Sequence, residues 1–346
     1  MENREPIDFV LPWVDGEDAS WRQRRDRYAQ ALAQRRDNDH GAVRYRDTNT
    51  LRYALRAIHA HCPWYGKIHL ITEGHLPPWL DASHPKIRIV THEELYFNRS
   101  HLPTFNSSSI EMNLPNLRGV SERFVYLNDD FLILAPLEEE RFFRDGLPVD
   151  FLLHGWIPRN RLYRALRDDS AWVHALNNNL ELINRVAPPA GIRRKETLYH
   201  SSYPASGKLA NFLLDRLWRR YYFIRHWHHP QPYLFSALRE AYELFKEPMM
   251  RCSANRFRSE NDLTQYLYRY YHLATERFMP RYYGDGYHAD IRSLEDLPAV
   301  FDALQSGRYR FAAIYDNYPA EESERVVGAL TAFLERFYPR KAPFEK

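Results

Sequence analysis

The sequence predicts an α/β protein in which a mostly parallel sheet is covered by helices. Short apolar runs typical of strands alternate with helical patterns over residues 5–130, and the same alternation returns near residue 310. Between them, long aromatic and basic helical stretches carry few strand signals. We therefore expect three parts: an α/β core at 1–136, a mainly helical lobe at 137–275, and a strand and helix at 276–346 that return to the core.

The first expected strand covers residues 7–14 and ends in the acidic turn 15–18. Pro12 lies inside this strand, and proline cannot donate a hydrogen bond to a neighbouring strand. The strand is therefore at an edge, contains a bulge, or ends earlier than its composition indicates. A charged amphipathic helix is predicted to follow at 19–36.

The next helix is indicated by Leu51, Leu55 and Ile58, which repeat at helical spacing, and it must stop at Cys62-Pro63. Further strands are expected at 67–72, 87–91, 124–127 and 311–315, and the last helix has an apolar face between residues 326 and 337. Two strands of the core end in acidic clusters, residues 15–18 and Asn128-Asp129-Asp130, and Asp316-Asn317 follows the strand at 311–315. Ligands of open α/β sheets bind beyond the carboxyl ends of the strands, so both clusters lie where a site is expected.

The composition excludes several classes of protein. A formal charge of +3 over 346 residues is too small to indicate nucleic-acid binding. Cys62 and Cys252 are the only cysteines, which excludes a disulfide framework and a cysteine zinc site. The chain has no apolar run of the roughly 20 residues that span a bilayer, and its first residues lack the pattern of a signal peptide. The expectation is a cytoplasmic enzyme.

The Asn128-Asp129-Asp130 cluster is the sharpest local candidate for a metal site. Carboxylates at a strand end are hard oxygen ligands for Mg²⁺ or Mn²⁺, and such a cation bridges the phosphates of a bound diphosphate. Because side chains alternate along a strand, both aspartates face one ligand only if the strand has already ended. We expect Asp130 to be the ligand and keep Asp129 as the alternative. An isolated cluster of this kind is more often a solvated turn.

Three further groups of residues could carry chemistry. Asp15 precedes Gly16 at the end of the first strand, although Asp-Gly is also a common turn. In the stretch 225–230, a histidine could accept a proton from an attacking hydroxyl, or the stretch could be packed aromatic structure. Arg251, Arg256 and Arg258 are suited to phosphate oxygens, or they form a solvated basic face.

Taken together, these segments resemble the Stealth family, which contains bacterial capsular-polysaccharide phosphotransferases and the animal GlcNAc-1-phosphotransferase. The similar blocks occur in the expected order and cover about half of the chain. The first is 7–18; the second runs through 44–80, 87–95, 102–111 and 124–130; the third is 228–238 with 256–273; the fourth is 310–319 with 337–346.

The resemblance implies a Rossmann-like, glycosyltransferase-A-type sheet, a nucleotide-sugar donor (a UDP-hexose or UDP-N-acetylhexosamine), a glycan acceptor and Mg²⁺ or Mn²⁺. It assigns Asp15 and Asp130 to the acidic donor site, and His228 and Arg258 to the catalytic histidine and the phosphate-binding arginine. It also implies substrate-binding positions, at Asp47, Asn106, Arg256, Asp262, Asp316 and Asn317.

The expected reaction is transfer of hexose 1-phosphate from the donor to an acceptor hydroxyl, with release of UMP. The alternatives are a conventional metal-dependent glycosyltransferase that releases UDP and a carbohydrate-binding protein without turnover. The stretch 208–229 mixes Leu, Phe, Trp and Tyr with Arg, so peripheral contact with the inner face of the cell membrane is a further expectation, against a packed helical lobe as the alternative.

Overall fold

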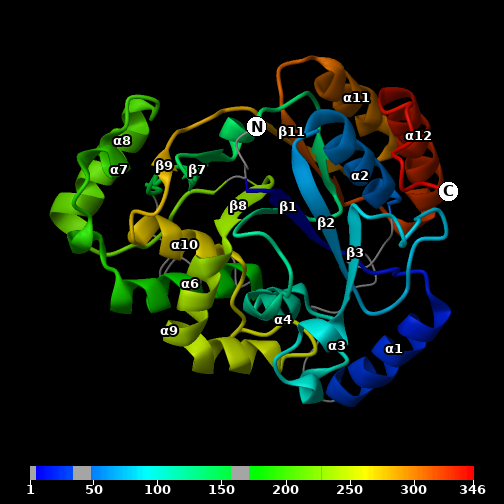
Figure 1. Cartoon of the computed structure of the whole chain (residues 1–346), viewed down its shortest axis with the longest axis horizontal. Coiled ribbons are helices and arrows are strands. Elements are labelled where there is room, and N and C mark those ends of the chain that lie inside the picture. Colours follow the sequence, from blue (N-terminus) through cyan, green and yellow to red (C-terminus); the bar gives the residue numbers. More distant parts are fainter. Residues whose placement is uncertain (1–4, 34–47, 157–170, 227) are drawn as a thin grey trace.

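The computed structural model describes residues 5–33, 48–156, 171–226 and 228–346 (Figure 1). Its main sheet has five strands in the order β3-β2-β1-β4-β8. The pairs β1/β2, β2/β3 and β1/β4 are parallel, and β8 closes one edge antiparallel to β4. The predicted α/β fold with a mostly parallel sheet is confirmed. The strands are β1 Ile7–Pro12, β2 Tyr65–Thr72, β3 Ile87–Thr91, β4 Arg123–Tyr126 and β8 Gln231–Leu234.

The central strand β1 has neighbours on both sides, so Pro12 is not at a sheet edge. Pairing with β4 stops at Val10, and Pro12 is the last strand residue, opposite Ile71 of β2. The strand is therefore shorter than its composition indicates, which was one of the three expected solutions. The missing N–H of Pro12 falls where the β4 ladder has already ended.

A buried carboxylate joins the strands at the other end of β1. Asp8 Oδ1 accepts a hydrogen bond from the backbone N–H of Lys67 at 2.7 Å, and Oδ2 accepts from His69 Nε2 at 3.0 Å and Ser121 N at 2.8 Å. These bonds outweigh the effect of burial and lower the pKa of Asp8. The carboxylate thus fixes the register between β1 and β2 and the position of the loop that leads into β4.

A second sheet lies beside the first, with strand order β10-β11-β5. β10 Gly286–Ile291 and β11 Phe311–Asp316 are parallel, whereas β5 Phe131–Ile133 is antiparallel to β11. The last part of the chain thereby returns to the segment that directly follows β4. A third, small sheet joins three short strands: β6 Phe143–Arg144, β7 Leu147–Asp150 and β9 Met279–Pro280.

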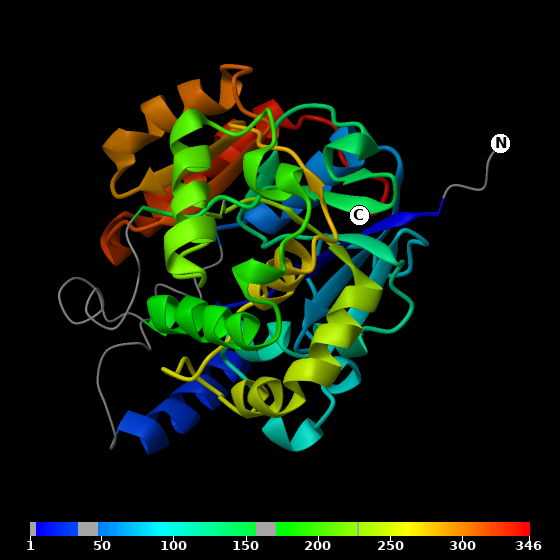
Figure 2. The same cartoon turned by 90° about the vertical axis from the view of Figure 1, so that its left-hand side faces the viewer.

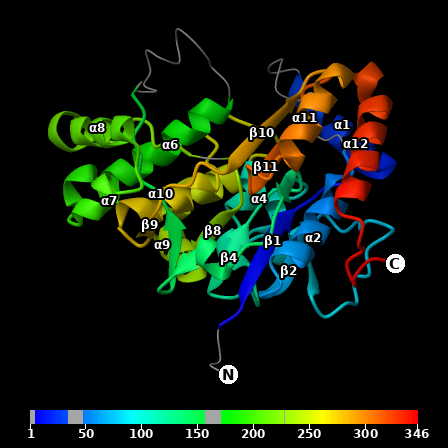
Figure 3. The same ribbon diagram turned by 90° about the horizontal axis from the view of Figure 1, so that it is seen from above.

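The helices divide into two groups on opposite sides of the molecule (Figures 1 and 3). α2, α11 and α12 lie beside the strands of the two sheets, and Arg56 of α2 binds Glu335 of α12 and Glu345 near the C-terminus. The bounds of this group and of the N-terminal helix are α1 Ala19–Ala33, α2 Thr50–His61, α11 Leu297–Gln305 and α12 Ser323–Phe337.

The other group comes from the middle of the chain and forms the face seen in Figure 2. This segment is mainly helical, and it also supplies β8 to the main sheet. Two short helices, α3 and α4, follow β3. The bounds are α3 His92–Leu95, α4 Ser107–Glu111, α6 Ala171–Val186, α7 Lys195–Tyr199, α8 Ala205–Leu213, α9 Phe235–Ser253 and α10 Tyr266–Ala274.

Within the described ranges, none of the helices combines the length and the apolar character that crossing a bilayer requires.

Candidate active site

A pocket of about 750 Å³ opens where the carboxyl ends of β1 and β4 meet the end of β11 and the helical segment. Its position is the one expected for a ligand of an open α/β sheet. The sheet side contributes Trp13, His92 and Asn106, and the helical side contributes Trp172, Arg258 and Tyr266. The other polar side chains at the pocket are Thr48, Thr50, Thr104, Ser107, Glu111, Asn128, Asp129, Asp130, His226, His228, Gln265, His288, Tyr315, Asp316 and Asn317.

Asp129 and Asp130 lie in a turn between two strands. β4 ends at Tyr126 and β5 begins at Phe131, so the alternation of side chains along a strand does not apply to them. Ile314 N of β11 donates to Asp130 O at 3.1 Å, which holds the turn against the second sheet. Both aspartate side chains therefore line the same pocket.

Negative charge is concentrated around Asp130. Burial, followed by the neighbouring carboxylates Asp129 and Asp316, raises the pKa of Asp130 well above its usual range. Asp130 Oδ1 is buried and accepts no hydrogen bond from the described residues. A cation bound here would offset both the burial of this carboxylate and its repulsion by the neighbouring carboxylates.

The carboxylates suit a cation whose remaining coordination positions are filled by the substrate. No group of three His, Cys, Asp or Glu side chains in the described part of the chain is already arranged to hold a metal. Mg²⁺ commonly binds through only one or two carboxylates together with waters and substrate phosphates. Asp129 and Asp130 with a bound diphosphate would satisfy that requirement.

His228 faces the acidic turn. Its Nε2 lies 4.0 Å from Asp130 Oδ2, and its ring stacks on Tyr315 and meets Phe131 edge-on. Burial, followed by His288 and His229, lowers the pKa of His228 to about 3, so the ring is neutral at physiological pH.

The adjacent His229 points elsewhere. It does not line the pocket; its ring stacks on Phe311 and its Nδ1 donates to Pro230 O at 2.7 Å. The two neighbouring histidines therefore have different surroundings.

Arg258 reaches the pocket from a loop that is tied to α4. Its Nη2 donates to Ser107 Oγ at 3.3 Å. The loop is fixed by Asp262, whose carboxylate accepts from Asn106 Nδ2 at 3.0 Å and Ser259 N at 3.0 Å. Asp262 is buried and does not line the pocket, so it contacts the loop rather than a ligand. Asn106 lines the pocket and also forms this internal bond.

Other sequence-predicted residues differ in position. Asp316 and Asn317 line the pocket at the end of β11. Asp15 does not: its Oδ1 accepts from Glu17 N at 2.9 Å, which closes a local turn. Arg256 also lies outside the lining and donates to Leu102 O at 3.1 Å. Asp47 lies outside the described residues.

The pocket also contains Glu111, which the sequence analysis did not single out. Glu111 is buried at the end of α4, and its carboxylate accepts from Gln265 N at 2.7 Å and Tyr126 Oη at 3.3 Å. Burial raises its pKa to about 7, although Gln265 N and the Arg258 guanidinium partly offset the rise. The only sequence signal was its place at the end of the block 102–111.

An aromatic wall on the helical side was also missed. Tyr266 stacks near His226 with ring centroids 4.6 Å apart, and Trp172 packs edge-on against Tyr266 at 5.8 Å. These rings come from distant parts of the chain, α6, the segment before β8 and α10, so no local pattern indicated that they meet. His288 of β10 also lines the pocket, and its ring centroid lies 6.5 Å from that of His228.

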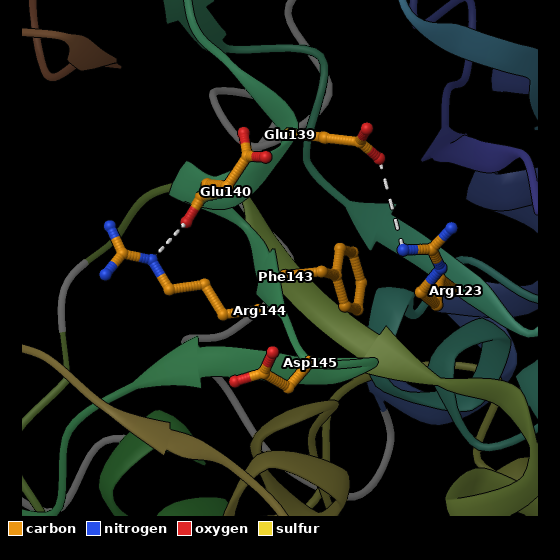
Figure 4. A pocket seen from close by; sticks show the side chains of 6 residues that line it. All are labelled: Arg123, Glu139, Glu140, Phe143, Arg144 and Asp145. Carbon is orange, nitrogen blue, oxygen red and sulfur yellow. Dashed lines mark hydrogen bonds and ion pairs between the residues drawn. The ribbon is translucent and has the colours of Figure 1, made fainter. Parts of the chain in front are cut away.

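A second, shallower hollow beside β6 lacks this combination of groups (Figure 4). Its two arginines already have partners: Arg123 lies 4.0 Å from Glu139, and Arg144 Nε donates to the backbone carbonyl of Glu140 at 3.2 Å. We therefore place the candidate active site in the larger pocket.

Comparison with known proteins identifies the family. The models for Stealth protein conserved regions 1 and 2 match residues 5–33 and 44–149. A capsular polysaccharide phosphotransferase WcwK of Streptococcus pneumoniae is 31% identical, and the match covers 100% of both chains. This chain belongs to the Stealth family. The resemblance noted in the sequence is thus confirmed.

Other members of the Stealth family agree. An exopolysaccharide phosphotransferase cps2G of Lactiplantibacillus plantarum is 31% identical, over 98% of this chain and 96% of the relative. A receptor polysaccharide phosphotransferase WefC of Streptococcus oralis is 30% identical, over 98% and 99%. As a Stealth protein with such relatives, the chain is an enzyme of the phosphotransferase class, as predicted.

Solved structures are more distant from this Stealth protein. A WbbM bifunctional glycosyltransferase has a TM-score of 0.41 and 10% identity, and the match covers 99% of this chain and 52% of the other. Because this similarity is low, we assign the α/β topology from the strand order of the chain itself.

Glu111 predicts a pH dependence of stability. Its raised pKa means that the folded state keeps a proton that the unfolded state loses between pH 4.5 and about 7. The free energy of unfolding therefore falls as pH rises through this window, by roughly 3 kcal/mol for this group. In Glu111→Gln this contribution disappears. Urea denaturation at pH 5 and pH 8 measures it, and an equal pH dependence in both proteins would contradict the assignment.

Proposed function

We propose that this enzyme transfers hexose 1-phosphate from a UDP-sugar to a hydroxyl of a glycan acceptor, in the synthesis of a capsular or cell-surface polysaccharide. The observation that carries the proposal is a single pocket that joins an acidic turn, a neutral histidine and an arginine. Those groups are the ones that phosphoryl transfer to a hydroxyl needs. Relatives that match the chain over nearly its whole length are named polysaccharide phosphotransferases.

In the proposed reaction the acceptor oxygen attacks the β-phosphorus of the donor. A new phosphorus–oxygen bond forms, the bond to the bridging oxygen breaks, and UMP leaves with that oxygen. The sugar remains attached to the transferred phosphate, so the product is a phosphodiester. Because such a transition state is loose, alignment and charge neutralisation supply most of the catalysis.

His228 is the proposed general base. Its neutral ring can accept the hydroxyl proton at a ring nitrogen, and the Asp130 carboxylate 4.0 Å from Nε2 would stabilise the imidazolium that forms. Tyr315 and Phe131 hold the ring on two sides, which fixes its direction.

Arg258 is the proposed phosphate ligand. Its guanidinium forms one hydrogen bond to Ser107, which leaves donors for phosphate oxygens. Trp172, which is partly exposed and packs edge-on against the buried Tyr266, offers a face on which an acceptor sugar can stack. Donor and acceptor would then enter from opposite sides of the same pocket.

A divalent cation, Mg²⁺ or Mn²⁺, is proposed as the cofactor, held by Asp130 with Asp129 or Asp316 nearby. When bound, it would neutralise charge on the donor diphosphate. Among the described residues, Asp130 is the first candidate because one of its buried oxygens accepts no hydrogen bond from them and because Asp129 and Asp316 place further negative charge beside it.

The identity of the released nucleotide tests the proposal. With a UDP-sugar panel, Mg²⁺ and short glycan primers, we expect UMP in equal amount to product and a phosphodiester resonance in the phosphorus NMR spectrum. Release of UDP with a simple glycosidic product would instead favour a conventional glycosyltransferase. The absence of any metal-dependent nucleotide release would indicate a binding protein.

The two histidines provide a matched pair of variants. We expect His228→Ala to lower kcat by roughly 10²-fold or more with little change in donor KM, because a general base acts on the chemical step. His229→Ala, which lies outside the pocket, should cost far less. Steady-state kinetics on folded variants makes the comparison. The reverse result would move the base to His229, and two active variants would exclude both of these histidines as the base.

Metal dependence is tested at Asp130. Activity should disappear in EDTA and return with Mg²⁺ or Mn²⁺, and Asp130→Asn should lose most turnover. Because burial and like charges disfavour the ionised form of this carboxyl, the variant should keep the stability of the parent or exceed it. Thermal unfolding checks this second point. Full turnover in EDTA would contradict the metal assignment.

A further inference from the structure

The outer face of α8 carries an unusual stripe of exposed apolar side chains. α8 continues into a π-helical turn, Leu214–Trp218. Leu209, Phe212 and Leu217 are exposed by 53%, 49% and 69%, although they lie within nine residues. We call these three side chains the α8 stripe. A surface helix normally turns its polar residues to solvent, so the exposed apolar side chains of the stripe are the opposite of the usual pattern.

The stripe is not the result of a loosely packed helix. A Cβ on Gly207 would come within 2.8 Å of Leu153, so the inner face of α8 approaches its neighbour closely. Asn211 donates to Leu152 O at 2.7 Å and accepts from His154 N at 2.9 Å. The inner face is thus packed and hydrogen-bonded. The buried positions on it are Gly207, Ala210, Asn211 and Leu214.

The sequence spacing agrees with this orientation. At about 100° per residue, positions 209, 212 and 213 fall on one side of α8, and its buried positions fall on the other. Leu217 follows in the π-helical turn, where its side chain is 69% exposed. The rotation of the helix is set by the inner contacts. The outward direction of the stripe therefore follows from the packing of α8.

Basic residues surround the stripe. Lys208, Arg216, Arg219 and Arg220 lie in the same segment, with Asp215 as the single acidic residue. The Arg216 side chain is 70% exposed and lies 3.5 Å from Asp215, and Arg219 and Arg220 are exposed. An apolar strip with a cationic margin matches a surface whose outer layer is anionic and whose interior is apolar.

We propose that the α8 stripe docks the enzyme on an anionic membrane surface. Leu209, Phe212 and Leu217 enter the boundary between headgroups and acyl chains, while the arginines bind lipid phosphates. α8 lies at the outer edge of the molecule in two perpendicular views, so a flat surface can reach it (Figures 1 and 3). The inference does not depend on the reaction proposed above.

Charge favours a membrane over a second copy of this chain as the occupant. In a two-fold symmetric dimer the same patch meets itself, so the basic margin of one copy would face that of the other. Anionic lipid has the opposite charge and removes this repulsion. The sequence-based expectation of membrane contact over 208–229 is thereby narrowed to the segment 208–220.

Liposome flotation at low salt tests the proposal. The protein should float with vesicles of phosphatidylcholine and phosphatidylglycerol and much less with phosphatidylcholine alone. Replacing Leu209, Phe212 and Leu217 together by Gln should weaken binding at least tenfold, because the apolar area that enters the boundary is lost. Arg216→Gln with Arg220→Gln should weaken it by about fivefold per arginine and reduce its dependence on salt.

Leu244→Gln is the matched control, because Leu244 on α9 is also 53% exposed but lies outside the stripe. It should float like the parent. Turnover of a short soluble primer should be unchanged in the triple variant, which separates this test from that of the reaction.

Three outcomes would overturn the proposal. They are failure of the parent to float, equal flotation of the parent and the triple variant, and a dimer in solution that the triple variant converts to monomer. The last outcome, measured by light scattering, would make the stripe a subunit interface.

Discussion

The buried hydrogen bond between Asn106 and Asp262 is the contact on which the candidate site depends. It joins the segment after β3 to the loop after α9, which are more than 150 residues apart in sequence. Asp262 also binds Ser259 N and Asn255 Nδ2, so one carboxylate closes the loop that carries Arg258. A buried acceptor of this kind is costly to leave unpaired, and it therefore forces the two segments into one relative position. Each segment contributes a side chain to the pocket, Asn106 from the first and Arg258 from the second.

The charged groups of that pocket suit the cation and the diphosphate that we propose as its ligands. The carboxylates at Asp129, Asp130 and Asp316 raise the free energy of the empty site, and burial keeps His228 neutral. Both effects are unfavourable for stability but suit a site that receives a cation and a diphosphate together. Arg258 supplies positive charge from the other side of the pocket. This distribution of charge suits the metal–diphosphate complex that we propose as the ligand.

The same helical segment presents two different surfaces. Toward the sheet it contributes the aromatic wall and Arg258, and at its outer edge it exposes the α8 stripe. Both surfaces are held by buried polar side chains, Asp262 near the pocket and Asn211 beneath α8. Each amide or carboxylate satisfies several backbone or side-chain groups and so fixes an element that has few other constraints. Such anchors allow a lobe with exposed apolar groups to keep one geometry.

The sequence by itself determined the family and five strands, β1, β2, β3, β4 and β11, but not β5, β8 and β10. Strand and helix patterns are local, since side-chain periodicity and prolines such as Pro63 act within a few residues. Tertiary structure decided which candidates face the pocket. Asp130, His228, Arg258 and Asp316 meet there, whereas Asp15, Arg256 and Asp262 do not line it. Glu111 and the aromatic wall became visible only in the fold, because burial and contacts between distant segments set their environment. No local pattern carries that information.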